Sequence, residues 1–177
     1  MNTKSKNLDG YGTPPIEWER VRETLTSDIT QAPGTGGPGR HTSWLTTTNP
    51  DGMPHVTPVG FVKLDGAWYF NSGPATRKSR NVAANPRCVV SVATHPFDLV
   101  LEGTATRITD SDELHSVATA FNTQGWPAQV EGDALTAEYS APSAGPPPWH
   151  VYRVTPATVF AFGTAEPYGA TRFDLTQ

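Results

Sequence analysis

Runs rich in β-branched and aromatic residues, separated by turn signals, recur along most of the chain. Such runs, bounded by Gly, Pro, Asn and Asp, predict strands joined by short turns. We expect six or seven strands, with one further short edge strand at the end of the chain. Their expected ranges are 41–48, 53–64, 67–71, 87–94, 97–108, 149–154, 158–162 and, for the edge strand, 170–175.

Two turns connect the first three of these strands. The run NPDG at 49–52 combines residues that favour a turn, and the pair DG at 65–66 is typical of a two-residue hairpin loop. Together they predict a β-meander over residues 41–71. The pattern as a whole favours a mainly β fold, a closed or partly closed antiparallel barrel with peripheral helices.

Three short helices accompany the strands, over residues 15–25, 76–84 and 111–124. The first and third carry acidic residues in their first turn, where they suit the positive end of the helix dipole. Residues 131–148 predict an irregular, proline-rich insertion. Residues 1–12 are polar and predict a flexible N-terminus. Residues 13–177 then form a single domain, large enough for one hydrophobic core.

Composition and charge narrow the function classes. Seventeen Pro and 16 Gly in 177 residues argue against a helical bundle, and the net charge of −4 gives no bulk reason to expect nucleic acid. No apolar run approaches the roughly 20 residues of a membrane span, and no basic-then-apolar leader opens the chain. A single cysteine, Cys88, excludes an intrachain disulfide. We therefore expect a cytoplasmic protein.

The helix expected at 76–84 reverses the usual charge pattern. Arg77 and Lys78 occupy its first turn and Arg80 follows. Cations there face the free N–H groups, at a cost of a few tenths to about 1 kcal/mol each. A bound anion would offset that cost, and phosphate is the natural candidate. The alternative is that both cations are solvated and screened; the small polar approach NSGP at 71–74 favours the phosphate.

Other chemical candidates are weaker. The five histidines are scattered and show no zinc spacing, so we expect no metal site. His55 and His95 are candidate proton donors, although a structural or surface role is the simpler reading. Cys88 lies within a strand and fits a buried, inert thiol. The Gly-rich run at 31–40 lacks the P-loop spacing and fits a linker. Trp44, Trp68 and Trp149 fit core or interface packing.

Three motifs give the chain a family resemblance. They are MPHVTPV at 53–59, YFNS at 69–72 and RKSRNVAANP at 77–86, in that order. From about residue 41 onward the chain resembles the pyridoxamine 5′-phosphate oxidase-like superfamily, whose fold is a split β-barrel of FMN-binding type. The later runs VYRVTP at 151–156, FAFG at 160–163 and TRF at 171–173 resemble the branch that uses the deazaflavin coenzyme F420.

The resemblance implies a homodimer with two cofactor sites, each built from both chains, and an F420-dependent oxidoreductase acting on a small conjugated substrate. It also implies roles for individual residues. The cofactor carries the hydride chemistry, so no catalytic side chain is assigned. By this resemblance, the ring system of the cofactor would contact Thr57, Pro58 and Val59, and its ribityl-phosphate part would lie beside Asn71 and Ser72. Its phosphate would bind Arg77 and Lys78, with Asn81 nearby on the same helix.

Two alternatives stay open. The first keeps the fold and replaces F420 with FMN. The FMN oxidases of the superfamily usually carry an Arg where His55 stands and a Lys near Phe61. These departures argue against true pyridoxamine phosphate oxidase activity in this chain. The second alternative is a non-catalytic cofactor-binding or carrier protein, since a fold does not by itself establish catalysis.

Overall fold

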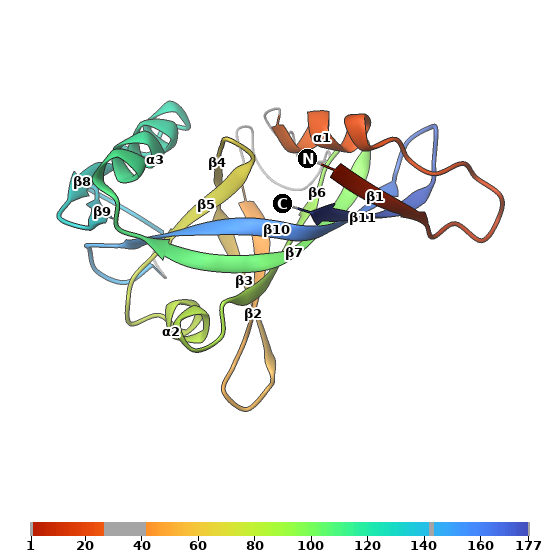
Figure 1. The fold of residues 1–177 in the computed structure, drawn as a ribbon. Coiled ribbons are helices and arrows are strands. Elements are labelled where there is room, and N and C mark those ends of the chain that lie inside the picture. Colours follow the sequence, from red (N-terminus) through yellow and green to blue (C-terminus); the bar gives the residue numbers. More distant parts are fainter. Residues whose placement is uncertain (1, 27–41, 142–143, 177) are drawn as a thin grey trace.

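A computed structural model describes residues 2–26, 42–141 and 144–176. The described residues form a nine-stranded antiparallel sheet, a separate two-stranded hairpin and three helices (Figure 1). The helices are α1 (Trp18–Thr26), α2 (Arg77–Ala84) and α3 (Ser111–Thr123). The strands are β1 (Asn2–Asn7), β2 (Thr42–Thr48), β3 (Pro54–Gly60), β4 (Val62–Leu64), β5 (Ala67–Ser72), β6 (Arg87–Ala93), β7 (Phe97–Ile108), β8 (Gln129–Glu131), β9 (Ala134–Thr136), β10 (His150–Gly163) and β11 (Ala170–Thr176).

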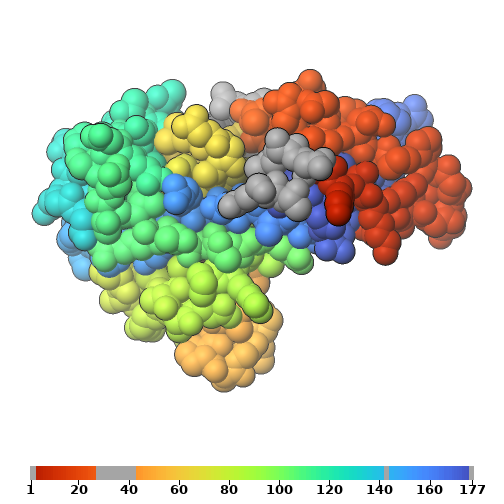
Figure 2. Space-filling view, in the orientation of Figure 1, coloured from red at the N-terminus to blue at the C-terminus, as the bar shows by residue number. Residues whose placement is uncertain are grey.

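Strand β10 organises the sheet. The strand order is β1-β11-β10-β7-β6-β2-β3, and β10 also pairs with β5, which in turn pairs with β4. Because β10 bonds to three strands, the sheet divides there and curls into a partly closed barrel (Figure 1). The β2–β3 hairpin projects from the body of the molecule (Figures 1 and 2). The mainly β fold predicted from the sequence is confirmed.

The buried side chains form two clusters. The larger one fills the barrel, with Phe70, Leu101 and Phe173 among its members, and α1 closes it through Val21. The smaller one lies under α3 and includes Leu114, on the other side of β5. Burying these apolar groups is the main stabilising contribution to the fold.

The tight turn expected at 65–66 is present. Asp65 has φ 50° and Gly66 has φ 79°, the left-handed pair that a two-residue hairpin loop requires. The strand expected over 53–64, however, is two strands. It breaks at Phe61 because β3 pairs with β2, whereas β4 pairs with β5. This break lets the chain pass from one side of the barrel to the other.

Four further sequence-based expectations are wrong in detail. Residues 1–12 are not a loose terminus throughout, because β1 pairs with β11 from Asn2 to Asn7. For the same reason β11 is not an edge strand. The two strands expected at 149–154 and 158–162 are one strand, β10, with a register shift between Pro156 and Thr158. The irregular segment at 131–148 contains part of a short hairpin, β8–β9.

Other local predictions are confirmed. α2, β7 and α3 lie at or within one residue of their expected bounds, and α1 begins three residues later than the helix predicted at 15–25. The Gly-rich run predicted as a linker at 31–40 lies outside the described residues. None of the described helices is long and apolar enough to cross a membrane.

Candidate functional site

The N-terminal turn of α2 carries two cations without an acidic partner. Thr76 caps the helix through its side chain, which accepts a hydrogen bond from the Ser79 backbone N–H. Arg77 and Lys78 both lie in the first turn of α2, where Arg77 is exposed and Lys78 is partly buried. Neither forms an ion pair within the described part of the chain. The reversed charge pattern seen in the sequence is therefore not neutralised by the fold.

A cluster of hydroxyl groups lies at the start of the same helix. The Ser72 and Thr76 hydroxyls are 2.7 Å apart, and the Thr76 hydroxyl also donates to Ser79 Oγ at 3.1 Å. Ser72 ends strand β5 and is 1% exposed. The strand end and the helix N-terminus thus meet in a polar corner, and Ser72, predicted from the sequence, lies in it.

Asn81 fixes α2 against the barrel. Its side-chain amide donates to Thr47 Oγ1 and to Asn49 Oδ1, both at 3.0 Å. Asn81 is 2% exposed, so these bonds are sheltered from water. The structure therefore gives Asn81 a positioning role for the helix, and a direct contact with cofactor stays a prediction.

The inner face of β3 lies beside the two cations. His55 is partly buried, and its pKa is lowered by that burial and, in second place, by the positive charges of Arg77 and Lys78. Burial also lowers the pKa of Lys78. A lowered pKa means, for both side chains, that the protonated, positively charged form is disfavoured because it loses water and gains no carboxylate partner. An anion would relieve this.

Thr57 adds an unsatisfied polar atom to the same face. Alternation along β3 places His55, Thr57 and Val59 on one side and Pro58 on the other. The Thr57 hydroxyl oxygen is buried and has no hydrogen-bond partner among the described residues. Buried polar groups are normally paired, so the Thr57 hydroxyl has hydrogen-bonding capacity that the described residues do not use.

The three residues predicted to contact a ring system therefore do not present their side chains together. Thr57 and Val59 face the barrel, and Val59 belongs to the core. Pro58 faces outward and pairs with Trp44. All three residues can instead offer the backbone of β3, which ends the strand order and, among the described strands, pairs with β2 alone.

Asn71 lies apart from the polar corner. Strand alternation places it on the opposite face of β5 from Ser72, on the side of Tyr69. Its side chain is partly exposed and forms no hydrogen bond with a described residue. Its predicted contact with a ribityl-phosphate group stays a prediction.

The proline-rich segment lies against this site. The backbone carbonyl of Ala144 occupies the place where a Cβ on Gly73 would lie, so only glycine permits this approach. Residues 144–148 and 73–76 together enclose a cavity of about 260 Å³ beside Thr76. The insertion that the sequence left without a role thus forms one wall next to the α2 N-terminus.

The remaining chemical candidates are inert or separate. Cys88 is 5% exposed, and burial raises the pKa of its thiol to about 12, as expected for an unreactive cysteine. His95 is exposed. Trp68 and Trp149 are buried, but Trp44 is 47% exposed. No group of three His, Cys, Asp or Glu side chains within the described ranges could hold a metal ion.

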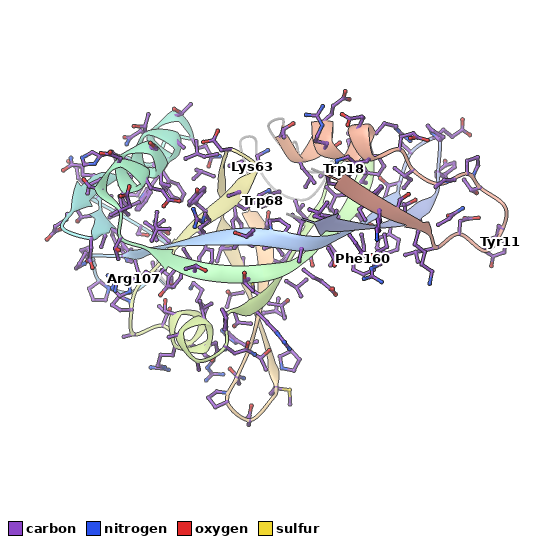
Figure 3. All side chains as sticks on the ribbon, in the orientation of Figure 1. Tyr11, Trp18, Lys63, Trp68, Arg107 and Phe160 are labelled. Carbon is purple, nitrogen blue, oxygen red and sulfur yellow. The ribbon has the colours of Figure 1, made fainter. Side chains whose placement is uncertain are left out.

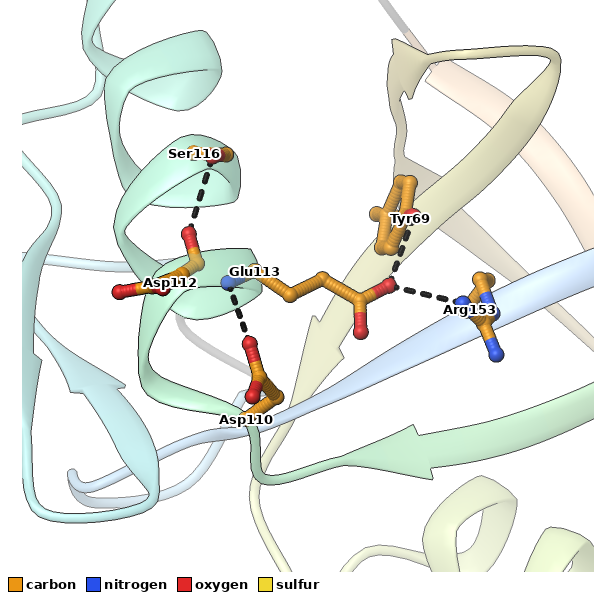
Figure 4. Close-up of polar contacts among 6 residues, drawn as sticks. All are labelled: Tyr69, Asp110, Asp112, Glu113, Ser116 and Arg153. Atoms are coloured by element: carbon orange, nitrogen blue, oxygen red, sulfur yellow. Dashed lines mark hydrogen bonds and ion pairs between the residues drawn. The ribbon is translucent and has the colours of Figure 1, made fainter.

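One polar cluster was missed by the sequence analysis. Glu113, in the first turn of α3, accepts a hydrogen bond from the Tyr69 hydroxyl at 2.8 Å and one from Arg153 at 3.1 Å (Figure 4). These three residues come from α3, β5 and β10, so no local spacing links them. Burial, and then the hydrogen bond to Glu113, raise the pKa of Tyr69.

The mainly antiparallel sheet that divides at β10 defines a split β-barrel fold, and comparison with known proteins agrees. The model of the pyridoxamine 5′-phosphate oxidase family matches residues 37–163. The chain therefore belongs to that family. No curated protein matches the chain.

Several solved structures share the fold. A conserved hypothetical protein from Mycobacterium tuberculosis is 18% identical, with a TM-score of 0.57 over 86% of this chain and 88% of the other. A putative pyridoxamine 5′-phosphate oxidase from Listeria innocua is 16% identical, with a TM-score of 0.54 over 81% and 95%. An FMN-binding, pyridoxamine 5′-phosphate oxidase-related protein from Nostoc punctiforme is 20% identical, with a TM-score of 0.51 over 75% and 78%.

Proposed function

We propose that this chain is an oxidoreductase that binds a flavin-type cofactor, and that the cofactor is coenzyme F420. The observation that carries the proposal is the pair of unpaired cations, Arg77 and Lys78, at the capped N-terminus of α2. When bound, the cofactor supplies hydride transfer, here to a small conjugated substrate. The chain's own part is to bind, orient and shelter it.

The residues of the site divide this work. Arg77, Lys78 and the free N–H groups of α2 would hold the phosphate. Ser72 and Thr76 supply hydroxyl groups beside it, at 2.7 Å from each other. Thr57, with its unpaired hydroxyl, and the edge backbone of β3 would meet the polar rim of the ring system. Such fixed polar groups orient a planar cofactor without moving.

The choice of F420 over FMN rests on the C-terminal motifs and on two positions of the barrel. His55 stands where the FMN oxidases of the superfamily usually have Arg, and its lowered pKa favours the neutral form. Phe61 is 4% exposed and packs edge-on against Trp68 and Phe70, so this strand position holds a buried aromatic ring near where the FMN oxidases usually have Lys. The alternative of FMN is supported by the family and by the description of the Nostoc protein.

We also propose that two copies pair through the outer face of the sheet. Cross-strand partners share a face, which places Trp44, Val100 and Phe160 on one surface. Val56 and Phe162 lie on the same side and are 52% and 40% exposed. An apolar surface of this kind favours association. It borders β3, so a partner there would complete the cofactor site.

A titration tests the proposal. Purified protein is titrated separately with F420 and with FMN, and binding is followed by fluorescence. We expect tight binding of F420 and weak binding of FMN. Lys78→Ala should weaken F420 binding at least about tenfold, because a charged hydrogen bond contributes roughly 1.5–3 kcal/mol. Lys6→Ala, which removes an exposed lysine of β1, is the matched control.

The outcomes distinguish an F420-dependent enzyme, an FMN-binding protein and a non-catalytic carrier. Preferential binding of FMN would move the chain to the flavin branch, and unchanged affinity in Lys78→Ala would refute the phosphate site. Binding of reduced F420 without its oxidation, across a broad panel of conjugated substrates, would indicate a carrier in place of an enzyme.

A further inference from the structure

Lys78 is a partly buried lysine in the first turn of α2. No acidic side chain in the described ranges forms an ion pair with it. Burial lowers the pKa of its amino group, so at a given pH more of this amine is neutral than in an exposed lysine. The neutral amine is the nucleophilic form of lysine. Lys78 is therefore placed for chemistry as well as for binding.

The charged groups close to Lys78 are cationic. Arg77 precedes it in the same helical turn, and His55 faces both from β3, because its pKa is lowered by burial and then by the charges of Arg77 and Lys78. Two elements thus contribute cationic side chains to one place. An anion is attracted to such a cluster and arrives beside the Lys78 amine.

The other lysines lie in different surroundings. The chain has four lysines, and Lys4 and Lys6 are exposed on β1. Lys6 lies opposite Arg172 across the β1–β11 pair, so it also has a cationic neighbour. Lys63 lies on β4, on the opposite side of β10 from α2, with its Nζ atom 6.0 Å from the centre of the Trp68 ring (Figures 1 and 3). Among the four lysines, Lys78 alone combines partial burial with a place in the first turn of a helix.

We propose that Lys78 is an acetylation site, modified directly by small acyl phosphates whose phosphate group binds at Arg77. The site rests on the proposed function in one respect, since it uses the same anion-binding cluster, whichever cofactor occupies that cluster. A lysine amine next to a second cation and partly removed from water is a recognised arrangement for nucleophilic reactivity.

The modification is an acyl transfer. The lone pair of the neutral Lys78 Nζ attacks the carbonyl carbon of the acyl phosphate. A C–N bond forms, the C–O bond to the phosphate breaks, and phosphate leaves with the bonding electrons. The proton of the amine passes to water, and no oxidant or further reactant is needed. Binding of the phosphate holds the carbonyl group beside the amine, which raises the rate.

Acetylation changes what the site can bind. An acetylated lysine carries no charge, so one of the two cations in the first turn of α2 is lost. The helix itself tolerates this loss, because a cation at its N-terminus opposes the helix dipole. A bound anion, in contrast, loses a partner. Acyl phosphates would in this way regulate binding of a phosphate-bearing cofactor.

The test incubates the purified full-length protein with acetyl phosphate and follows each lysine by peptide mass spectrometry. We expect Lys78 to be acetylated at least about tenfold faster than Lys6. Lys6 is the matched control, because it too lies near an arginine but is exposed on a strand. Inorganic phosphate should compete for the cluster and slow the acetylation of Lys78, with no effect on Lys6.

A second reagent and two variants test the role of the phosphate group. Acetic anhydride transfers the same acetyl group without a phosphate, so its preference for Lys78 over Lys6 should be at least about tenfold smaller. Arg77→Gln should reduce the preference shown by acetyl phosphate. Arg87→Gln is the control, since Arg87 is an exposed arginine at the start of β6, beyond the other end of α2, and its loss should change nothing.

Three results would overturn the proposal: equal acetylation of Lys78 and Lys6, an equal preference with acetic anhydride, or full preference retained in Arg77→Gln. None of them depends on the cofactor titration. Selective acetylation of a protein that binds neither F420 nor FMN would support the acetylation site and reject the proposed function. Unselective acetylation of a protein that needs Lys78 to bind F420 would reject the acetylation site and support the proposed function.

Discussion

At the scale of single residues, the polar and charged groups near α2 divide into those that the fold pairs and those that it leaves unpaired. Asn81 is satisfied by Thr47 and Asn49. The Thr57 hydroxyl and the cations at Arg77 and Lys78 have no partner of their own in the described chain. The first kind positions the helix, and the second kind is available to a ligand.

We predict that Asn81→Ala destabilises the protein by about 2–3 kcal/mol, because it removes two sheltered hydrogen bonds and leaves a buried threonine hydroxyl short of a donor. Asn122→Ala is the control. Asn122 also donates two hydrogen bonds, to the backbone of Ala118 and Ala128, but it is exposed and water can replace them. Urea unfolding measures both. Equal losses would contradict the positioning role of Asn81.

At the scale of elements, β10 determines how the barrel divides. It pairs along its length with β7 and, at its two ends, with β5 and β11. The bulge after Pro156 separates these two ends, and Gly103 of the neighbouring strand permits the close approach that the bulge requires. A glycine inside a strand is therefore a packing requirement here.

Gly103→Ala should destabilise the protein by roughly 1–3 kcal/mol or more, because the added methyl overlaps the backbone of Thr155 and Pro156. Gly60→Ala is the matched control. Gly60 is also a strand glycine without a positive φ, but nothing lies within 4 Å of its Cβ position. Thermal unfolding of the two variants gives the comparison, and a change of similar size in both would refute the packing argument.

At the scale of the whole molecule, one sheet face is covered and the other is not. α1 covers the barrel end through Val21, whereas Trp44, Val56 and Phe162 lie exposed on the outer face. The proposed cofactor site borders that outer face. The proposed homodimer and the proposed cofactor site therefore depend on the same surface.

We predict that Trp44→Glu converts a dimer to a monomer and weakens cofactor binding together. A charge in the centre of an apolar interface is costly when the partner desolvates it. Tyr168→Glu, at another exposed aromatic outside the sheet strands, should leave the dimer intact. Sedimentation measures the state of association. A monomeric wild-type protein, or a dimeric Trp44→Glu protein, would contradict the proposed interface.

Stability should also fall at acidic pH. Burial, followed by nearby cations, lowers the pKa of His55 and of His150 below the ordinary value of 6.5. The unfolded chain therefore takes up protons first, so stability is fully present above pH 6.5 and is lost as pH falls through that value toward the folded pKa values. Replacing both residues with Gln should flatten a plot of melting temperature against pH. An unchanged slope in the double variant would count against this explanation.

The sequence by itself determined what depends on near neighbours in the chain. Thr76 as helix cap, the Asp65-Gly66 turn and the cations at Arg77 and Lys78 are all readable because each signal spans only a few residues. The mainly β class follows from the same local patterns. The family motifs add the cofactor class as a prediction, without choosing F420 over FMN by geometry.

Only the tertiary structure decided what joins distant segments. The pairing of β1 with β11 links Asn2 to Thr176, and the break between β3 and β4 exists because each pairs with a different strand. The contact of Glu113 with Tyr69 and Arg153 joins three elements that no spacing relates. Local sequence sets backbone preference and alternation, but partner choice depends on packing across the whole barrel, where the free energy of burial is gained.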